Sequence, residues 1–371
     1  MVQHRMFEFD RNGAPVWDFR GKHLLYSETD GSSFPNGGLR ATHRAGGYLC
    51  LDPSSPILLR GDTIYIPACF FSYTGYALDE RTPLLRSCES MSTQGTRLLR
   101  LLGYDTAALV SNIGLEQEFF LVPRDAYLRR PDLQFTGRTL VGYEPARGQE
   151  MSDHYMGSLS YSQPALACIK EVQEKCFAMG IPLKTRHREV APNQYEFAPL
   201  FGTVTTQVDQ NLMVMQMLEE TAAAHGLTAL LHEKPFDKVN GSGKHNNWSI
   251  GTIGGINLLN YGQITAETKN PMVFPIVIAA IMKGFHAYGD LLRMAIATPG
   301  NDFRLGGMEA PPSIMSMYLG EDLTNYLEAL KNGSDASYSP TPKIVELGVC
   351  GIPLVSVPAE DRNRTSPFPY G

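Results

Sequence analysis

The sequence contains no closely spaced cysteine pair, no long apolar segment and no basic tract. Its six cysteines are scattered without a CxxC pair, which excludes zinc-ribbon and disulfide-scaffold proteins and predicts free thiols in the cytoplasm. The longest apolar run, 271–282, contains Pro275 and is too short to span a bilayer, so we expect no membrane partner. The first ten residues have no signal-peptide h-region. A net charge of −6 without a basic stripe argues against nucleic acid as a partner.

The residues that are present predict a folded protein with two domains. Hydrophobic residues make up 43% of the chain, which excludes wholesale disorder. A mass of 41.0 kDa exceeds the usual size of a single core, and we place the boundary near residue 80. The patterns predict helices at 82–102, 165–179, 208–225, 274–298 and 313–331. They predict strands at 63–66, 68–71, 107–111, 116–122, 183–201 around Pro192, 227–232 and 244–251. This mixed order favours an α+β fold over regular βαβ units.

The first acidic motif is Glu116-Gln117-Glu118, at the start of a predicted strand. Residues i and i+2 of a strand face the same side, so Glu116 and Glu118 are expected side by side. Two carboxylates that close repel each other unless a cation lies between them or one takes a proton. The motif therefore indicates an oxygen-ligand site for Mg²⁺ or Mn²⁺, with a solvated strand face as the alternative.

A second acidic motif contains Glu189 and Glu196. Seven residues separate them, which would put them on opposite faces of one continuous strand. Pro192 interrupts the strand and allows a turn that returns both carboxylates to one side. Two unrelated surface glutamates are the alternative interpretation.

A glycine-rich loop, 240–243, leads into a polar strand that contains Lys244 and His245. The loop does not match the P-loop pattern, but its glycines allow the backbone to approach a ligand closely. His245 is a candidate metal ligand, and a hydrogen-bonded structural histidine is the alternative.

Charged loops nearer the ends of the chain supply further candidates. Arg304 could hold a carboxylate with two hydrogen bonds, and Glu309 could bind or deprotonate a cationic nucleophile. Segment 361–365 offers two guanidinium groups for phosphate, and 29–33 is a polar turn. Surface salt bridges and ordinary turns are the alternatives for these segments.

Taken in order, these segments resemble glutamine synthetase, and specifically its long type III class. The stretches that carry the resemblance are Asp30-Gly-Ser-Ser, Phe34-Pro-Asn-Gly-Gly-Leu-Arg, Glu116-Gln-Glu-Phe-Phe-Leu-Val, Glu189-Val-Ala-Pro-Asn-Gln-Tyr-Glu196, Leu231-His-Glu-Lys-Pro-Phe, Asn240-Gly-Ser-Gly-Lys-His-Asn-Asn-Trp-Ser, Asn301-Asp-Phe-Arg-Leu-Gly, Glu309-Ala-Pro-Pro and Asp361-Arg-Asn-Arg-Thr-Ser-Pro. Gly137-Arg-Thr-Leu and Gly148-Gln-Glu with Asp153-His-Tyr also resemble the type III pattern.

The resemblance implies a partial N-terminal β-grasp domain over 1–80 and, over 81–371, a catalytic domain whose curved antiparallel sheet is backed by helices. It also implies ATP-dependent joining of glutamate and ammonium through a γ-glutamyl phosphate, with two or more Mg²⁺ or Mn²⁺ ions per site. The implied assembly is a homo-oligomer built from rings, in which neighbouring subunits share active sites.

Roles carried over from the resemblance fall into four sets. The expected metal ligands are Glu118, Glu189 and Glu196 for the ion near glutamate, and Glu116 and His245 for the ion near ATP. The expected glutamate-binding residues are Asn240, Gly241, His245 and Arg304. The expected catalytic residues are Asp30 and Glu309, which handle ammonium, together with Arg304. The expected nucleotide-binding residues are Asn247, Ser249 and Arg364.

Two other functions stay open at this point. The first is a γ-glutamyl ligase that uses another amine. The second is a non-catalytic relative that binds a nucleotide or metabolite, or an inactive fragment. The reason for this alternative is that the stretch resembling the family ends at residue 371, before a family strand that carries a further metal ligand.

Overall fold

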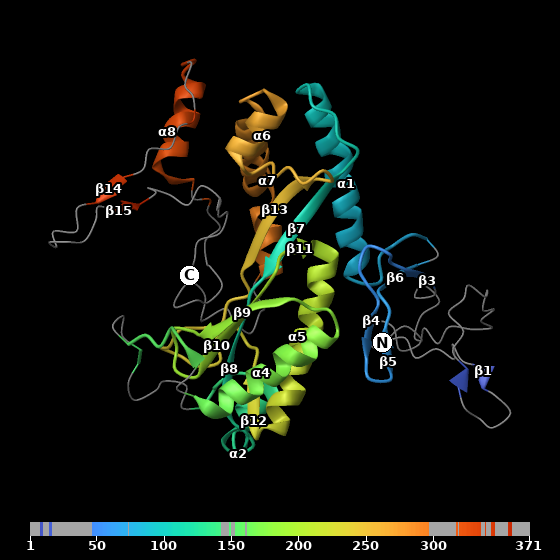
Figure 1. Ribbon diagram of the computed structural model, residues 1–371, viewed down its shortest axis with the longest axis vertical. Helices are drawn as coiled ribbons and strands as arrows, with labels where there is room; N and C mark the ends of the chain where they lie inside the picture. The colour runs from blue at the N-terminus through green and yellow to red at the C-terminus, as the bar shows by residue number, and fades with distance from the viewer. Residues whose placement is uncertain are drawn as a thin grey trace. The chain divides into compact units, whose positions relative to one another are not determined.

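The computed structural model describes residues 8–9, 15–16, 47–72, 74–141, 148–149, 153–159, 162–296, 317, 319–334, 338, 343–345 and 355–357. The chain divides into two compact units, Met1–Ser90 and Met91–Gly371 (Figure 1). The expected domain boundary near residue 80 stays a prediction. Among the helices described, none is both long enough and apolar enough to cross a bilayer.

The described part of the first unit consists of antiparallel strand pairs. These are β1 (Glu8–Phe9) with β2 (Pro15–Val16), β3 (Gly47–Leu51) with β6 (Ala68–Ser72), and β4 (Leu58–Arg60) with β5 (Thr63–Tyr65). Asp79 connects β6 to the start of helix α1 (Arg81–Leu101), because its carboxylate accepts the backbone N–H groups of Phe70 and Thr82. Satisfying an N–H of the first helical turn in this way stabilises the start of the helix.

Two antiparallel sheets form the centre of the second unit. The larger has the order β12-β8-β10-β9 and the smaller the order β11-β7-β13. Their bounds are β7 Leu109–Leu115, β8 Gln117–Pro123, β9 Leu183–Arg188, β10 Gln194–Pro199, β11 Gly202–Thr203, β12 Leu227–Leu230 and β13 Asn246–Thr252. Only Glu116 separates β7 from β8, so the chain passes from one sheet to the other at this residue.

Helices α4 (Gln163–Ala178) and α5 (Val204–Ala224) lie alongside the larger sheet (Figure 1). Alternate residues of β8 and β10 point toward these two helices, and the side chains on this face of the sheet are largely aromatic. Phe119 lies 5.5 Å from Phe197 and 6.1 Å from Tyr195 between ring centroids, and all three side chains are buried. The Tyr195 hydroxyl bonds Ser162 at the start of α4. Burial of this face leaves the intervening residues, including Glu118 and Glu196, on the opposite face.

A second core joins α6 (Tyr261–Thr268), the first turns of α7 (Val273–Ile296) and α8 (Gly320–Lys331). Trp248 and Ile250 of β13 pack against it, so this core supports the smaller sheet. The remaining described elements are α2 (Arg124–Tyr127), α3 (Pro131–Thr136), β14 (Lys343–Val345) and β15 (Val355–Val357).

The α+β class predicted from the sequence is confirmed, and most elements lie where expected, but three predictions need correction and one helix was missed. Glu116 does not open a strand, since it lies between β7 and β8, and β7 continues to Leu115 where we expected an end at 111. The helix predicted at 313–331 begins later than expected. Residues 317 and 319 are not helical, and α8 begins at Gly320. Helix α6 was not predicted, because eight residues give too few repeats of a helical apolar period.

Candidate metal and substrate site

The hairpin between β9 and β10 brings Glu189 and Glu196 together. Pro192 lies in the turn, and Asn193 adopts a left-handed φ of 57°, which asparagine accepts more readily than most residues. The Glu189 N–H donates to Gln194 O at 2.9 Å and closes the turn. The expected turn at Pro192 is therefore present, and both carboxylates lie on the face away from α4 and α5.

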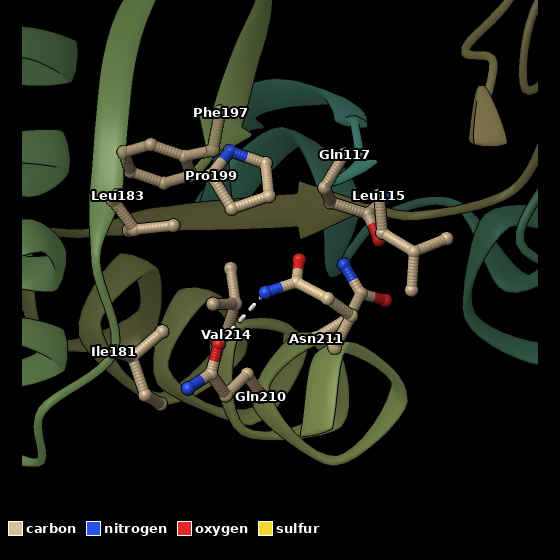
Figure 2. A pocket seen from close by; sticks show the side chains of 10 residues that line it. Leu115, Gln117, Ile181, Leu183, Phe197, Pro199, Gln210, Asn211 and Val214 are labelled. Atoms are coloured by element: carbon tan, nitrogen blue, oxygen red, sulfur yellow. Dashed lines mark hydrogen bonds between the residues drawn. The ribbon is translucent and has the colours of Figure 1, made fainter. Parts of the chain in front are cut away.

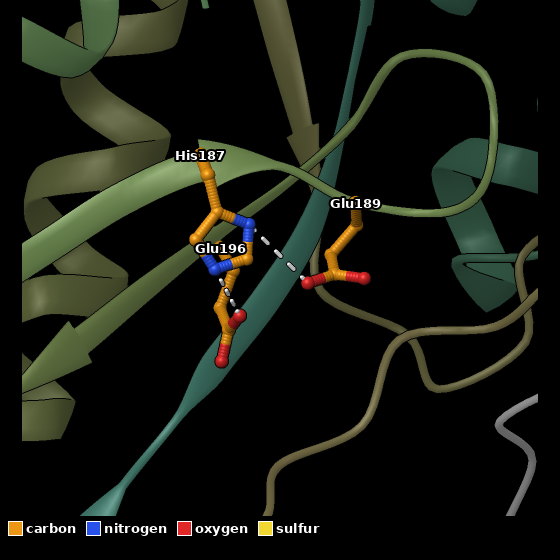
Figure 3. A group of neighbouring side chains, drawn as sticks. All are labelled: His187, Glu189 and Glu196. Carbon is orange, nitrogen blue, oxygen red and sulfur yellow. Dashed lines mark ion pairs between the residues drawn. The ribbon is translucent and has the colours of Figure 1, made fainter. Parts of the chain in front are cut away.

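His187 completes a group of three metal-binding side chains with Glu189 and Glu196 (Figure 3). Its Nε2 lies 2.9 Å from Oε2 of Glu196, and its Nδ1 lies 3.4 Å from Oε1 of Glu189. One ligand atom from each of the three residues lies within 4.8 Å of the others. Both glutamates are buried, at 7% relative exposure each, so water screens their charges poorly.

Strand register aligns this group with Glu118. Glu196 of β10 lies opposite Glu118 of β8 on one side and opposite His187 of β9 on the other. Residues directly opposite in antiparallel strands share a face, so the three side chains form a row across the sheet.

A second group consists of Glu116, Glu118 and His245. Nδ1 of His245 lies 3.1 Å from Oε2 of Glu116 and 3.5 Å from Oε1 of Glu118. The backbone supports this contact, because the Glu116 N–H donates to His245 O at 3.1 Å. Glu118 thus belongs to both arrangements: its strand position aligns with Glu196, and its carboxylate lies beside His245.

The 240–243 loop is fastened to the same carboxylates. Oε2 of Glu118 accepts the Gly243 N–H at 2.8 Å and the side-chain amide of Gln194 at 3.3 Å. The same amide nitrogen of Gln194 donates to Gly241 O and to Ser242 Oγ. Gly243 has a steric reason to be glycine, because a Cβ there would lie 2.4 Å from Nε2 of His245.

The electrostatics of the first group require a compensating positive charge. Hydrogen bonding to Glu196 raises the pKa of His187 to about 9, so its imidazole is protonated at neutral pH. Burial, followed by the neighbouring Glu196, raises the pKa of Glu189 to about 7. The proton on His187 therefore supplies the charge that a cation bound by the two glutamates would otherwise supply.

The donor set fits a divalent cation that accepts carboxylate oxygen and imidazole nitrogen. Mg²⁺ prefers oxygen ligands, and Mn²⁺ also accepts imidazole. Glu189, Glu196 and His187 can form one site, and Glu116, Glu118 and His245 can form a second. Because Glu118 aligns with Glu196 in register, two such cations would be neighbours.

Sequence models of two protein families match the chain. The one described as "Glutamine synthetase type III N terminal" covers residues 1–87, and "Glutamine synthetase, catalytic domain" covers residues 73–283. The chain belongs to the glutamine synthetase family.

Two members of the family are similar over nearly the whole chain. "Type-3 glutamine synthetase" of Dictyostelium discoideum is 46% identical over 367 residues, which make up 98% of this chain and 49% of that protein. A glutamine synthetase of Bacteroides fragilis is 43% identical over 365 residues, 98% of this chain and 49% of that protein. The chain spans about half the length of these curated relatives. The solved structure "CryoEM Plasmodium falciparum glutamine synthetase" matches with a TM-score of 0.44 and 20% identity, over 62% of this chain and 45% of that chain.

Some of the site residues expected for a glutamine synthetase lie in the described structure and others do not. Asn247 and Ser249 lie two residues apart on β13, opposite Gly114 and Asn112 of β7. Asn247 is exposed and Ser249 half-buried. Asp30, Arg304, Glu309 and Arg364 lie outside the described residues, so their roles stay predictions.

His187 was not predicted as a metal ligand from the sequence. A usable signal was present, because His187 and Glu189 have the same i, i+2 spacing as Glu116 and Glu118. Gln194 was not predicted as a site residue either, since its contacts reach residues 76 and 47 positions away along the chain.

A separate pocket lies on the opposite face of the sheet, between β8, β10 and α5 (Figure 2). Gln117 lines it together with Phe197 and Asn211. The Gln117 side chain is buried and its Nε2 donates to Glu118 O at 2.8 Å. Gln117 and Glu118 therefore face opposite sides of β8, as the strand period predicts.

Proposed function

We propose that this chain carries the catalytic site of a type III glutamine synthetase, which joins glutamate and ammonia at the expense of ATP. The observation that carries the proposal is the pair of carboxylate–imidazole groups, His187 with Glu189 and Glu196, and His245 with Glu116 and Glu118, beside the 240–243 loop. Relatives named glutamine synthetase at 43–46% identity support the same assignment.

In the proposed reaction the γ-carboxylate of glutamate takes the γ-phosphoryl group of ATP, which releases ADP. Ammonia then attacks the acyl phosphate and releases phosphate, which is a far better leaving group than a carboxylate oxygen. Bound Mg²⁺ or Mn²⁺ would supply positive charge against the phosphates and the glutamate carboxylate.

The residues of the chain have distinct roles in this proposal. Glu118, Glu189 and Glu196, with His187 beside them, would hold the cation near glutamate, and Glu116 and His245 would hold the cation near ATP. Glu118 lies between the two groups, since it is opposite Glu196 in register and its carboxylate lies beside His245. Asn240 and Gly241 present polar groups to glutamate from a loop whose position Gln194 and Glu118 fix. Asn247 and Ser249 lie on β13, which begins directly after His245, and this position supports their proposed role near the nucleotide phosphates.

The proposal extends to the domains and the assembly. We assign 1–80 to a partial β-grasp domain and 81–371 to the catalytic domain, and we propose a ring of subunits that share sites. Asp30 and Glu309 would deprotonate and hold ammonium, while Arg304 and Arg364 would bind glutamate and phosphate. Light scattering coupled to size exclusion, with activity read across the fractions, tests the assembly.

A γ-glutamyl hydroxamate assay with ATP, hydroxylamine and Mg²⁺ or Mn²⁺ tests the activity. We expect product that depends on both glutamate and the cation and that is lost in Glu196→Gln. Comparing ammonium with putrescine as acceptor separates this function from that of a γ-glutamyl ligase for another amine. Absence of hydroxamate from a folded chain that binds Mn²⁺ would favour the non-catalytic alternative.

A further inference from the structure

Gln149 lies in a buried position between the expected substrate loop and the metal-binding hairpin. Its relative exposure is 9%. The side-chain nitrogen donates to Val190 O and to Asp153 O, at 2.6 Å each. Its side-chain oxygen accepts from the backbone N–H of Asn240 at 3.0 Å and from the Asn240 side-chain amide at 3.2 Å. A glutamine amide has two N–H donors and one oxygen with two lone pairs, so these four bonds use its full capacity.

The two ends of this amide reach different parts of the site. Val190 follows Glu189 directly, so the nitrogen end contacts the backbone of the metal-binding hairpin. The oxygen end fixes both the backbone and the side-chain amide of Asn240. With its nitrogen bonded to Gln149, the Asn240 side chain has a defined orientation that directs its own oxygen away from Gln149.

The backbone at Gly148 and Gln149 packs closely against Lys238, just before Asn240. The Gln149 N–H donates to Lys238 O at 2.7 Å. A Cβ at Gly148 would lie 3.1 Å from Cβ of Lys238 and 3.3 Å from its carbonyl oxygen, which is closer than nine in ten real Cβ contacts. Glycine at 148 therefore allows the loop to approach, and glutamine at 149 holds it there.

We infer that Gln149 is a positioning residue that sets Asn240 relative to Glu189 and so determines the affinity for the carboxylate-bearing substrate. The inference rests on the proposed function for the identity of that substrate. Gln149 does not itself bind the cation, because its amide is fully used in these four bonds. The hairpin that carries Glu189 and Glu196 has a further bond of its own, from Glu189 N–H to Gln194 O. Loss of the Gln149 amide should weaken glutamate binding much more than Mn²⁺ binding.

The test compares Gln149→Met with Gln134→Met in the full chain. Gln134 is an exposed glutamine of α3 whose amide also donates to two backbone carbonyls, those of Tyr127 and Leu128, away from the site. Titration calorimetry measures the Kd of Mn²⁺, and then the Kd of L-glutamate with Mn²⁺ saturating. For Gln149→Met we expect the glutamate Kd to rise about tenfold or more, because both hydrogen bonds that hold Asn240 are lost, and the Mn²⁺ Kd to change less than about threefold. Gln134→Met should change neither.

Hydrogen exchange provides a readout that does not depend on the substrate. Exchange at 238–243 should become faster in Gln149→Met than in the parent chain and unchanged in Gln134→Met. Gly148→Ala, a milder change that pushes Lys238 away, should act in the same direction if Gln149→Met folds poorly.

Each failure has its own signature. Unchanged exchange at 238–243, or faster exchange with an unchanged glutamate Kd, overturns the positioning role while the proposed function stands. A parent chain that binds Mn²⁺ but no glutamate rejects the proposed function, and the positioning role with it.

Discussion

Nε2 of His187 lies 2.9 Å from Oε2 of Glu196, directly opposite it on the neighbouring strand. The contact couples the proton of an imidazole to a carboxylate that is also a candidate metal ligand. Protons and divalent cations therefore compete for the same cluster, and the competition can be measured.

The first prediction is that Mn²⁺ binding becomes tighter as the pH rises from about 7 to about 9. The pKa of Glu189 is raised to about 7 and that of His187 to about 9, so both protons must leave as a cation binds. Titration calorimetry in buffers of different ionisation enthalpy would detect the released protons. Affinity that does not vary with pH across this range would contradict the competition.

The second prediction concerns the stability of the metal-free protein. Because the pKa of His187 is raised from 6.5 to about 9, its stabilising charge is fully present below pH 6.5 and is lost as the pH rises through 9. The Tm should therefore fall over that window, and saturating Mn²⁺ should reduce the fall. In His187→Gln the part of the decline that is due to this residue should disappear. An equal decline in the variant would show that other groups cause it.

The third prediction is that neutralising one carboxylate weakens Mn²⁺ binding. Glu189→Gln and Glu196→Gln each remove a charged oxygen ligand from a group of three, so we expect at least a tenfold rise in the Kd, about 1.4 kcal/mol. Glu219→Gln, on an exposed part of α5, is the matched control and should have no effect. Gln117→Ala removes a side chain from the opposite face of β8, so it should lower stability and leave the Kd nearly unchanged.

The fourth prediction tests the steric role of Gly243. Gly243→Ala places a methyl group 2.4 Å from the present position of His245 Nε2, so the ring must shift and its present contact with Glu116 must change. We expect one of two Mn²⁺ binding events to weaken while the other is retained. Gly284→Ala, in α7 with nothing within 4 Å, is the control and should preserve both. Equal binding by the two variants would refute this role.

The fifth prediction concerns a structural carboxylate away from the site. Asp132 accepts two hydrogen bonds from Arg130, at 3.0 and 2.6 Å, and also accepts the N–H groups of Leu133, Leu140 and Val141. Asp132→Asn should lower the free energy of unfolding by about 2 kcal/mol, whereas Asp125→Asn, in an exposed pair with Arg129, should cost less than about 1 kcal/mol.

Acid should reproduce the effect of the Asp132 substitution. The Arg130 guanidinium holds the pKa of Asp132 well below its ordinary value of 3.8. Its stabilising contribution is therefore present above that value and is lost as the pH falls below it. Urea titrations at neutral and acidic pH would measure both effects, and equal losses for the two variants would contradict them.

The sequence predicted what local patterns determine. The strand face of Glu118, the turn at Pro192 and the long helix α5 all follow from periods of two or 3.6 residues and from turn chemistry. Glu116 lies outside β8, so its position depends on the bond from its N–H to His245 O and not on the strand period.

The remaining features depend on contacts between distant segments. Gln149 meets Asn240 across 91 positions, and Gln194 meets Glu118 across 76. The periodic patterns of helices and strands extend over a few residues, so they cannot predict contacts between residues so far apart in the sequence. The end of β7 was missed for a related reason, since its pairing with β13, and not its own apolar pattern, carries it to Leu115.

The row formed by Glu118, Glu196 and His187 makes this site sensitive to insertions and deletions. Ligands on loops can be moved along the chain by changing loop length, but these three side chains meet through the count of residues along three paired strands. One residue added in β10 between Gln194 and Tyr195 would turn Tyr195 toward the row and Glu196 toward α5. Two added residues would restore the face but displace the carboxylate by about 7 Å along the strand. Length changes in this hairpin should therefore be confined to the turn, while β8, β9 and β10 keep their residue count wherever the chemistry is retained.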